Sequence, residues 1–117
     1  MNGFPKDLDL QDIIGSEIQQ ICLGRGDVQF RFGSGRLICV QGLAEVFQGE
    51  QRISAWDRDG NWSSAAFQTL LMRRIEAYAV LGERLLQIGF EGGLRLCLHD
   101  DSTQFECLQI YPEEIIV

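Results

Sequence analysis

Asp27-Val-Gln-Phe-Arg-Phe, followed by a short glycine turn and Gly35-Arg-Leu-Ile-Cys-Val, indicates the fold of this chain more clearly than any other segment. Val28, Phe30 and Phe32 alternate with polar residues, which is the pattern of a strand with one buried face. The glycines between the two runs favour a tight turn. The stretch therefore predicts an antiparallel β-hairpin.

The second half of the chain repeats the first. Three of its segments match three earlier ones. The first match is between Ile18-Gln-Gln-Ile-Cys-Leu-Gly and Ile75-Glu-Ala-Tyr-Ala-Val-Leu-Gly. The run that begins at Asp27 matches Leu85-Leu-Gln-Ile-Gly-Phe, and the run that begins at Gly35 matches Gly93-Leu-Arg-Leu-Cys-Leu. Such self-similarity predicts two copies of one three-stranded meander. The 117 residues have the length of one domain, so we expect a single domain over 1–117 with an internal repeat at 15–42 and 73–100.

The segment between the repeats predicts further elements. Residues 43–47 and 51–56 have the composition of two more strands, and Ser63 or Ser64 is a suitable N-cap for a helix that ends near Arg73. Outside the repeats, shorter segments extend the pattern: a helical turn at 9–14 and strands at 105–110 and 114–117.

Together these elements predict a mostly β fold of the α+β kind, in which one helix lies between two related antiparallel β-meanders. Matching apolar faces would pack the meanders as a sandwich or a partly open barrel. The predicted core consists of the inward-facing strand residues: Phe30, Phe32, Ile38, Val40, Leu86, Ile88, Phe90, Leu96 and Leu98. Leu37, Cys39 and Cys97 are apolar on the opposite face, so we expect the helix or a second subunit, in a homodimer, to cover them.

The formal net charge is −7, and among the scattered arginines only Arg73 and Arg74 are adjacent. Nucleic acid and anionic membranes require a positive footprint, so we expect neither as a partner. The charge favours a basic protein partner, although modest acidity also serves solubility alone. No stretch approaches the roughly 20 apolar residues of a membrane helix, and residues 1–7 lack the pattern of a signal peptide. We therefore expect the cytoplasm.

The four cysteines, Cys22, Cys39, Cys97 and Cys107, lie in apolar strand-like runs without Cys-x-x-Cys spacing. This spacing does not suit a zinc site, and we expect no metal and no other cofactor. In a reducing compartment such cysteines act as small buried hydrophobic residues. The repeat places Cys39 and Cys97 equivalently, which leaves a contact between them open.

Two short motifs have both a functional and a structural interpretation. Asp57-Arg-Asp-Gly-Asn resembles part of a calcium loop, but its glycine comes too early and the twelfth position is Gln68. An acidic turn that leads into a helix explains the same residues. Arg25-Gly-Asp spells a cell-adhesion tripeptide, yet a hairpin turn requires the same glycine.

His99 is the single histidine of the chain and is followed by Asp100 and Asp101. A histidine beside carboxylates can act as a base, so an enzyme that works through this group is one hypothesis. A polar strand end with a turn is the other interpretation. No serine or cysteine has the context of a nucleophile that would complete a triad, and we predict a protein without catalytic activity.

The best candidate for a binding surface lies where the repeat is interrupted, because insertions on a scaffold tend to carry function. Two tryptophans flank an acidic loop there, and aromatic side chains anchor protein interfaces. The residues of this predicted protein-binding patch are Glu45, Glu50, Trp56, Asp57, Asp59 and Trp62. In the alternative interpretation, the tryptophans pack the loop and the helix onto the sheet.

Several segments also carry a resemblance: Gly15-Ser-Glu-Ile-Gln-Gln-Ile-Cys, Val28-Gln-Phe-Arg-Phe, Gly35-Arg-Leu-Ile-Cys-Val, and Gln104-Phe-Glu-Cys-Leu-Gln-Ile with Ile115-Ile-Val. They are similar to a group of small bacterial β-rich proteins in which a hydrophobic strand pair precedes a Tyr-Glu-Ser-Tyr/Phe-x-Ile-like segment and a terminal Ile-Val. Some of these relatives sit among immunity proteins of bacterial toxin systems. Here residues 105–110 stand in for that segment and depart from it at both aromatic positions and at the serine. The resemblance implies a binding protein without catalysis and assigns no site residues.

These observations predict a non-enzymatic, acidic protein-binding domain, with an immunity-type inhibitor of a basic partner as its specific form. One alternative is a small-molecule or metal-binding β-domain whose site lies between the two meanders. The other alternative is a structural homodimer.

Overall fold

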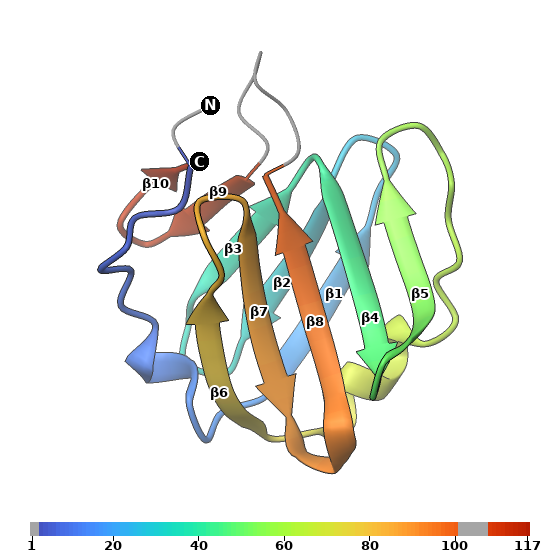
Figure 1. Ribbon diagram of the computed structural model, residues 1–117, viewed down its shortest axis with the longest axis horizontal. Coiled ribbons are helices and arrows are strands. Elements are labelled where there is room, and N and C mark those ends of the chain that lie inside the picture. The colour runs from blue at the N-terminus through green and yellow to red at the C-terminus, as the bar shows by residue number, and fades with distance from the viewer. Residues whose placement is uncertain (1–2, 101–107) are drawn as a thin grey trace.

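A computed structural model describes residues 3–100 and 108–117. Within these residues, ten strands form two antiparallel five-stranded sheets that pack face to face (Figure 1). Sheet A has the spatial order β1 (Ile18–Leu23), β2 (Val28–Phe32), β3 (Leu37–Val40), β9 (Leu108–Tyr111) and β10 (Ile115–Ile116). Sheet B has the spatial order β5 (Gln51–Asp57), β4 (Leu43–Gln48), β8 (Leu94–His99), β7 (Leu85–Phe90) and β6 (Ile75–Val80). The mostly β sandwich that the sequence predicts is confirmed.

Each sheet combines a meander from one half of the chain with a hairpin from the other half. The meander β1–β2–β3 is extended by the hairpin β9–β10, which pairs through β9 with β3. The meander β6–β7–β8 is extended by the hairpin β4–β5, which pairs through β4 with β8. Strands β1 to β5 correspond in chain order to strands β6 to β10. When each strand is replaced by its counterpart, the strand order of sheet A becomes that of sheet B.

The two edge strands that begin the meanders also share a local irregularity. The register between β1 and β2 shifts between Ile18 and Gln20, and the register between β6 and β7 shifts between Ile75 and Ala77. A bulge bends the strand that carries it. Both edge strands therefore bend at the corresponding place, near their beginning.

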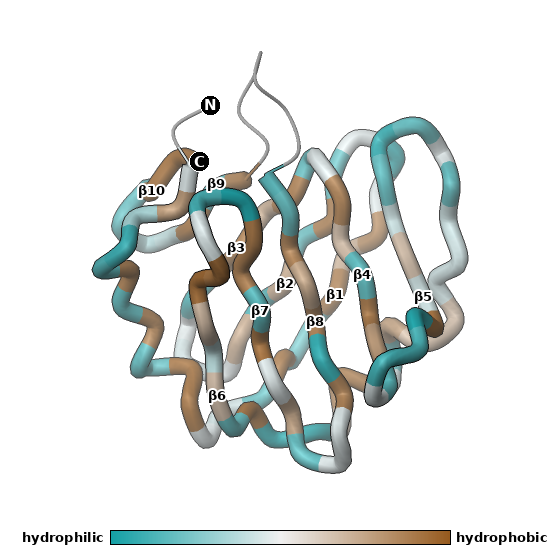
Figure 2. The backbone as a smooth tube through the Cα atoms, viewed as in Figure 1, coloured by the Kyte–Doolittle hydropathy of each residue, from teal (hydrophilic) through white to brown (hydrophobic). Residues whose placement is uncertain are grey.

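The core lies between the two sheets. All nine strand residues predicted for it are buried, and none is more than 3% exposed. Figure 2 shows hydrophobic and hydrophilic residues alternating along strands such as β7 and β8, as expected when one face of a sheet is buried. Burial of these apolar side chains is the main favourable contribution to folding.

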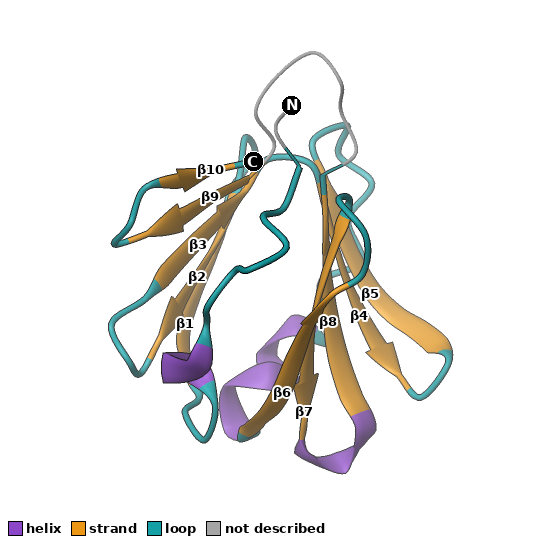
Figure 3. Cartoon of the chain, turned by 60° about the vertical axis from the view of Figure 1, so that its left-hand side comes forward, coloured by secondary structure: helices purple, strands orange, loops and turns teal. Residues whose placement is uncertain are grey.

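Two 3₁₀-helical segments complete the core. The first, η1 (Gln11–Ile13), precedes β1, and the second, η2 (Phe67–Met72), precedes β6. Ile13 and Leu70 are each 0% exposed. Figure 3 shows the N-terminal segment running along the open side between the sheets. A third turn, η3 (Glu91–Gly93), joins β7 to β8.

The helical element predicted between the two meanders is present, but it is a 3₁₀ segment and shorter than the predicted span from Ser63 or Ser64 to Arg73. The backbone of Ser63 exchanges two hydrogen bonds of 2.9 and 3.0 Å with that of Ala55, so the chain is extended there. Helical structure begins only at Phe67, and the N–H of Ala66 donates to the hydroxyl oxygen of Ser54 from β5 at 2.8 Å. A tertiary contact with β5 therefore replaces the predicted serine cap.

Candidate functional site

The predicted patch lies on the β4–β5 hairpin and on the loop that follows it. Its members are Glu45 within β4, Glu50 in the hairpin turn, Trp56 and Asp57 at the end of β5, and Asp59 and Trp62 in the loop. The seven residues of β5 span about 20 Å, so Glu50 lies at the opposite end of this hairpin from the tryptophans. The structure thus groups Trp56, Asp57, Asp59 and Trp62 and separates Glu50 from them.

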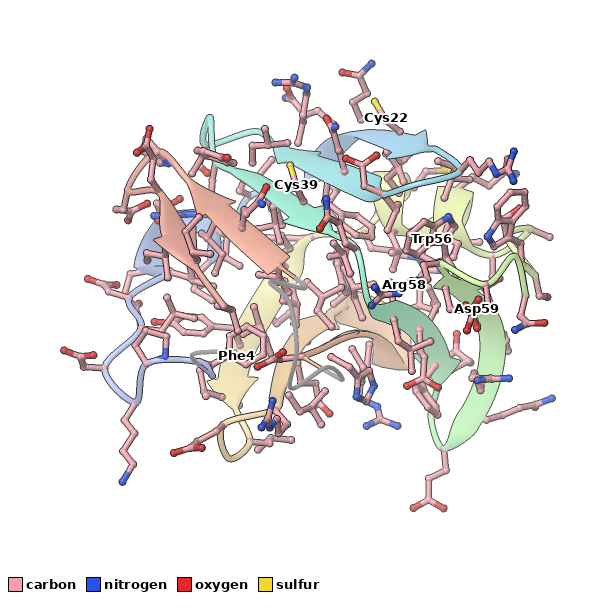
Figure 4. The ribbon with its side chains drawn as sticks, turned by 90° about the horizontal axis from the view of Figure 1, so that it is seen from above. Phe4, Cys22, Cys39, Trp56, Arg58 and Asp59 are labelled. Atoms are coloured by element: carbon pink, nitrogen blue, oxygen red, sulfur yellow. The ribbon has the colours of Figure 1, made fainter. Side chains whose placement is uncertain are left out.

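Trp56 is a core residue that joins the two sheets. Its side chain is 1% exposed, and its Nε1–H donates to the carbonyl oxygen of Gly24 at 2.8 Å. Gly24 belongs to the turn between β1 and β2 of sheet A, whereas Trp56 belongs to β5 of sheet B. Figure 4 shows Trp56 beside Arg58 and Asp59. The packing interpretation of this tryptophan agrees with its burial.

Trp62 has the opposite environment and borders a cavity. Its exposed fraction is 51%, and that of Leu23 at the end of β1 is 48%. A cavity of about 270 Å³ is lined by Leu23, Gly24, Arg25, Trp56, Trp62 and Ser64. A second cavity of about 300 Å³ shares Leu23 and Ser64 and continues to Ile21 and Leu71. We call the two cavities together the β1 groove.

Asp57 holds the loop that carries Trp62. One carboxylate oxygen accepts the N–H groups of Asp59 and Asn61 at 2.9 and 3.1 Å, and the other accepts the Asn61 side-chain amide at 3.0 Å. These hydrogen bonds hold the pKa of Asp57 below its usual range, and the bond from the Asn61 side chain has the largest effect. The carbonyl oxygen of Asp57 accepts Nε1–H of Trp62 at 2.9 Å. The acidic-turn interpretation therefore accounts for Asp57, whose carboxylate is used within the loop.

Glu45 is bound by two basic side chains on the outer face of sheet B. Its Oε1 lies 2.5 Å from His99 Nε2, and its Oε2 accepts from Arg52 Nη1 at 3.1 Å. Asp100 instead is buried and accepts from Arg84 Nη1 at 3.1 Å. The structure therefore pairs His99 with Glu45 and not with Asp100, while Asp101 lies outside the described residues.

Cys39 and Cys97 do not meet. Each alternates in its strand with core residues and so points to the outer face of its own sheet, which Figure 4 shows for Cys39. Each pairs on both neighbouring strands with a glutamine or glutamate, and these long side chains leave them only 8% and 4% exposed. The predicted cover by the helix is wrong, because η2 packs into the core through Phe67 and Leu70.

The environment of Cys39 and Cys97 disfavours the thiolate form of both side chains. Burial is the main cause that raises the pKa of both groups. A thiol with a raised pKa is a poor nucleophile and a poor metal ligand. Cys22 is exposed, and Cys107 lies outside the described residues.

The Arg25-Gly-Asp tripeptide forms a hairpin turn, in which Gly24 N–H donates to Asp27 O at 2.9 Å.

Within residues 3–100 and 108–117, no three His, Cys, Asp or Glu side chains are grouped as they would be around a metal ion. No helix in this part of the chain is long and apolar enough to cross a membrane. The chain matches no family model, no curated protein and no solved structure. The candidate site therefore rests on the geometry of the β1 groove.

The sequence pattern identifies the two tryptophans but not the opposite wall of the groove. Ile21 and Leu23 alternate with Gln20 and Cys22, a pattern that predicts a strand with one apolar face. It does not say that β1 is an edge strand, which depends on pairing across the whole sheet. The alternation identifies the apolar face of this strand. Only the order of strands in the sheet shows that this face borders a groove.

Proposed function

We propose that this chain is a non-enzymatic protein-binding domain that contacts its partner through the β1 groove and the adjoining loop. The observation that supports this function is the exposed pair Leu23 and Trp62 at the rim of an apolar cavity. Tryptophan is a typical anchor of protein interfaces, and exposed apolar side chains around a pocket mark an interaction site. The buried Trp56 supplies a rigid wall for such a pocket.

A basic partner fits the net charge of −7. Asp59 is exposed beside the tryptophans, and Glu50 is exposed at the far end of the hairpin. Charges of this kind mainly raise the association rate and its sensitivity to salt. An immunity-type inhibitor that neutralises a basic toxin in the cytoplasm is the specific form of the proposal.

The test is affinity capture from a host lysate, followed by association kinetics with the captured protein. Asp59→Lys should slow association by about three- to tenfold at low salt and reduce its salt dependence. Asp57 is left unchanged, because its carboxylate holds the loop. Glu76→Lys on the exposed part of β6 makes the same charge change elsewhere and serves as the control. Equal slowing by both variants would contradict the assignment of this surface.

A small-molecule site is the second candidate function. Core side chains fill the space between the sheets, where the sequence predicts the site of a ligand-binding domain. The candidate cavity lies instead at the edge of a sheet. A cavity of about 460 Å³ opens along β6, next to Tyr78 and Gln11. This volume falls in the range of ligand pockets, roughly 300–1,000 Å³. A metabolite that raises the melting temperature of the wild type and not of Tyr78→Ala would favour this candidate.

A further inference from the structure

We infer that the free edge of β1 binds an extended segment of the partner as an added strand, with one aromatic side chain of that segment in the cavity between Trp56 and Trp62. The inference rests on the proposed function and specifies the part of the partner that is recognised. In strand addition, main-chain hydrogen bonds supply affinity, and pockets for alternate side chains supply specificity.

The register of β1 and β2 identifies the free backbone groups. Gly24 N–H donates to Asp27 O at 2.9 Å, so these two residues form a hydrogen-bonded pair. Bonded and non-bonded pairs alternate along an antiparallel ladder. Ile21 and Leu23 therefore occupy non-bonded positions, and their N–H and C=O groups point away from β2. Because β1 is the edge strand of sheet A, these groups face the groove.

The side chains around this edge suit an apolar segment. Ile21 and Leu23 form one wall of the groove, and Ser64, Gln68 and Leu71 contribute to the other. Successive residues of an added strand point alternately to opposite faces. Its inward residues would contact these apolar side chains, and the residue opposite the end of β1 would reach the tryptophan cavity.

The corresponding turn in the second half of the molecule is covered by an aromatic residue of the N-terminal segment. Leu81 N–H donates to Leu85 O at 2.8 Å in the β6–β7 turn, the counterpart of the β1–β2 turn. Phe4 N–H donates to Glu83 O of this turn at 2.9 Å, and its side chain is 3% exposed. At the β1–β2 turn Trp56 is likewise buried and bonded to Gly24, but Trp62 beside it is half exposed and a cavity is present. Figure 4 shows Phe4 and Trp56 on opposite sides of the molecule.

The occupant therefore has a definite chemistry. It is an extended segment with an aromatic residue that fills the cavity lined by Trp56 and Trp62. The net charge of −7 and the exposed Asp59 favour lysine or arginine in the segment, on the side of the cavity away from Arg25, which lines it. Proline is disfavoured in the segment, because it cannot donate to Leu23 or Ile21.

The probe is a phage-displayed library of random 12-residue peptides, panned on the full chain. Enriched peptides should carry an aromatic residue together with lysine or arginine. Binding of a synthesised hit should slow amide hydrogen exchange of Ile21 and Leu23 by at least about tenfold. The amides of Gln20 and Cys22 already bond to β2 and should not change. This pattern within one strand separates strand addition from general stabilisation.

Leu23→Pro removes the outward N–H and leaves the ladder to β2 intact, since proline is tolerated in an edge strand where its nitrogen faces outward. It should weaken peptide binding at least about tenfold, whereas Val80→Pro, the same change at the counterpart position of β6, should not. Trp62→Ala, at an exposed position, should weaken binding as well and covers the case in which Leu23→Pro does not fold.

Absence of enriched peptides would overturn the inference, and so would hits that protect Tyr78 and Val80 instead of Ile21 and Leu23. A protein captured from lysate equally by the wild type and by Leu23→Pro would also overturn it. In that last case the proposed function would stand while strand addition at β1 would fail. The two proposals can therefore fail separately.

Discussion

At the scale of single residues, the two tryptophans differ in what they contribute to the molecule. Trp56 is 1% exposed and bonded to Gly24, whereas Trp62 is 51% exposed. We predict that Trp56→Ala lowers the free energy of unfolding by about 3–5 kcal/mol, and that Trp62→Ala changes it by less than about 1 kcal/mol. Urea unfolding followed by circular dichroism measures both values. Equal losses for the two variants would contradict the assignment of Trp56 to the core.

A buried arginine connects three parts of the chain. Arg36 at the start of β3 is 7% exposed and lies 2.6 Å from Asp12, before β1, and 2.7 Å from Glu113, in the β9–β10 turn. Hydrogen bonds from Arg36 are the main cause that holds the pKa of both carboxyls below their usual ranges. We predict that Arg36→Met lowers the free energy of unfolding at pH 7 by about 1–2 kcal/mol, a value reduced because both carboxylates are partly exposed.

The sign of the pH dependence follows from the lowered pKa values. A carboxyl whose pKa is lower in the folded state stabilises the fold above its unfolded pKa, and this contribution is lost as the pH falls through the folded pKa. The difference in melting temperature between wild type and Arg36→Met should therefore shrink between about pH 5 and pH 3. Arg52→Met, at a position that is 55% exposed, is the control and should have little effect at either pH. A difference that stays constant over this range would contradict the role of Arg36.

These residues also show what local sequence patterns can predict. The nine core residues follow from alternation, because a strand buries every second side chain. The partners of Arg36 lie 24 and 77 residues away along the chain. No local pattern encodes such a pairing, since it depends on which strands become neighbours.

At the scale of elements, η1 and η2 have the same role in the two halves. Ile13 and Leu70 are each 0% exposed and belong to the core. We predict that Ile13→Ala and Leu70→Ala each lower the free energy of unfolding by about 2–5 kcal/mol. Gln68→Ala, at an exposed position of η2, should cost less than about 0.5 kcal/mol. Chemical denaturation measures all three, and a loss for Gln68→Ala as large as those for Ile13→Ala and Leu70→Ala would contradict the assignment of these losses to burial.

The loop at Asp57 gives a second prediction at this scale. Asp57→Ala removes the acceptor for the N–H groups of Asp59 and Asn61, so both amides should exchange at least about tenfold faster. In the wild type the pKa of Asp57 is lowered, so this protection should persist to below about pH 4 and be lost as the pH falls further. Asp59→Ala leaves the Asp57 carboxylate in place, so exchange of the Asn61 amide should not change in this control variant. Unchanged exchange in Asp57→Ala would contradict the account of this loop.

The strands could be predicted from sequence far better than the helix. Alternation and glycine turns place every described strand to within two or three residues of its observed bounds. The serine N-cap predicts a helix that begins at Ser63 or Ser64, but it cannot reveal that Ser63 pairs with Ala55 and Ala66 with Ser54. Those tertiary bonds restrict the helical segment to a short 3₁₀ turn.

At the scale of the whole molecule, the correspondence between the halves extends beyond the meanders. Val40 and Leu98 correspond and are 58 positions apart. On the neighbouring strand of its own sheet, Val40 pairs with Leu108 and Leu98 pairs with Ala44. Ala44 and Leu108 also correspond, but they are 64 positions apart. The longer connection before β9 changes the spacing, which hides the β4–β5 and β9–β10 correspondence from a sequence comparison. Pairing between halves places β1 at an edge, and this placement creates the groove that the sequence alone could not predict.

We propose that this domain binds a protein partner through the surface around Trp62. Quantitative affinity capture from a host lysate with wild type, Trp62→Ala and Leu81→Ala is the decisive experiment, because Trp62 and Leu81 are exposed to the same degree, 51% and 49%. We predict that a basic protein captured by the wild type is retained by Leu81→Ala and reduced at least about tenfold by Trp62→Ala, the loss expected of an interface anchor. Equal capture by all three proteins would contradict the account.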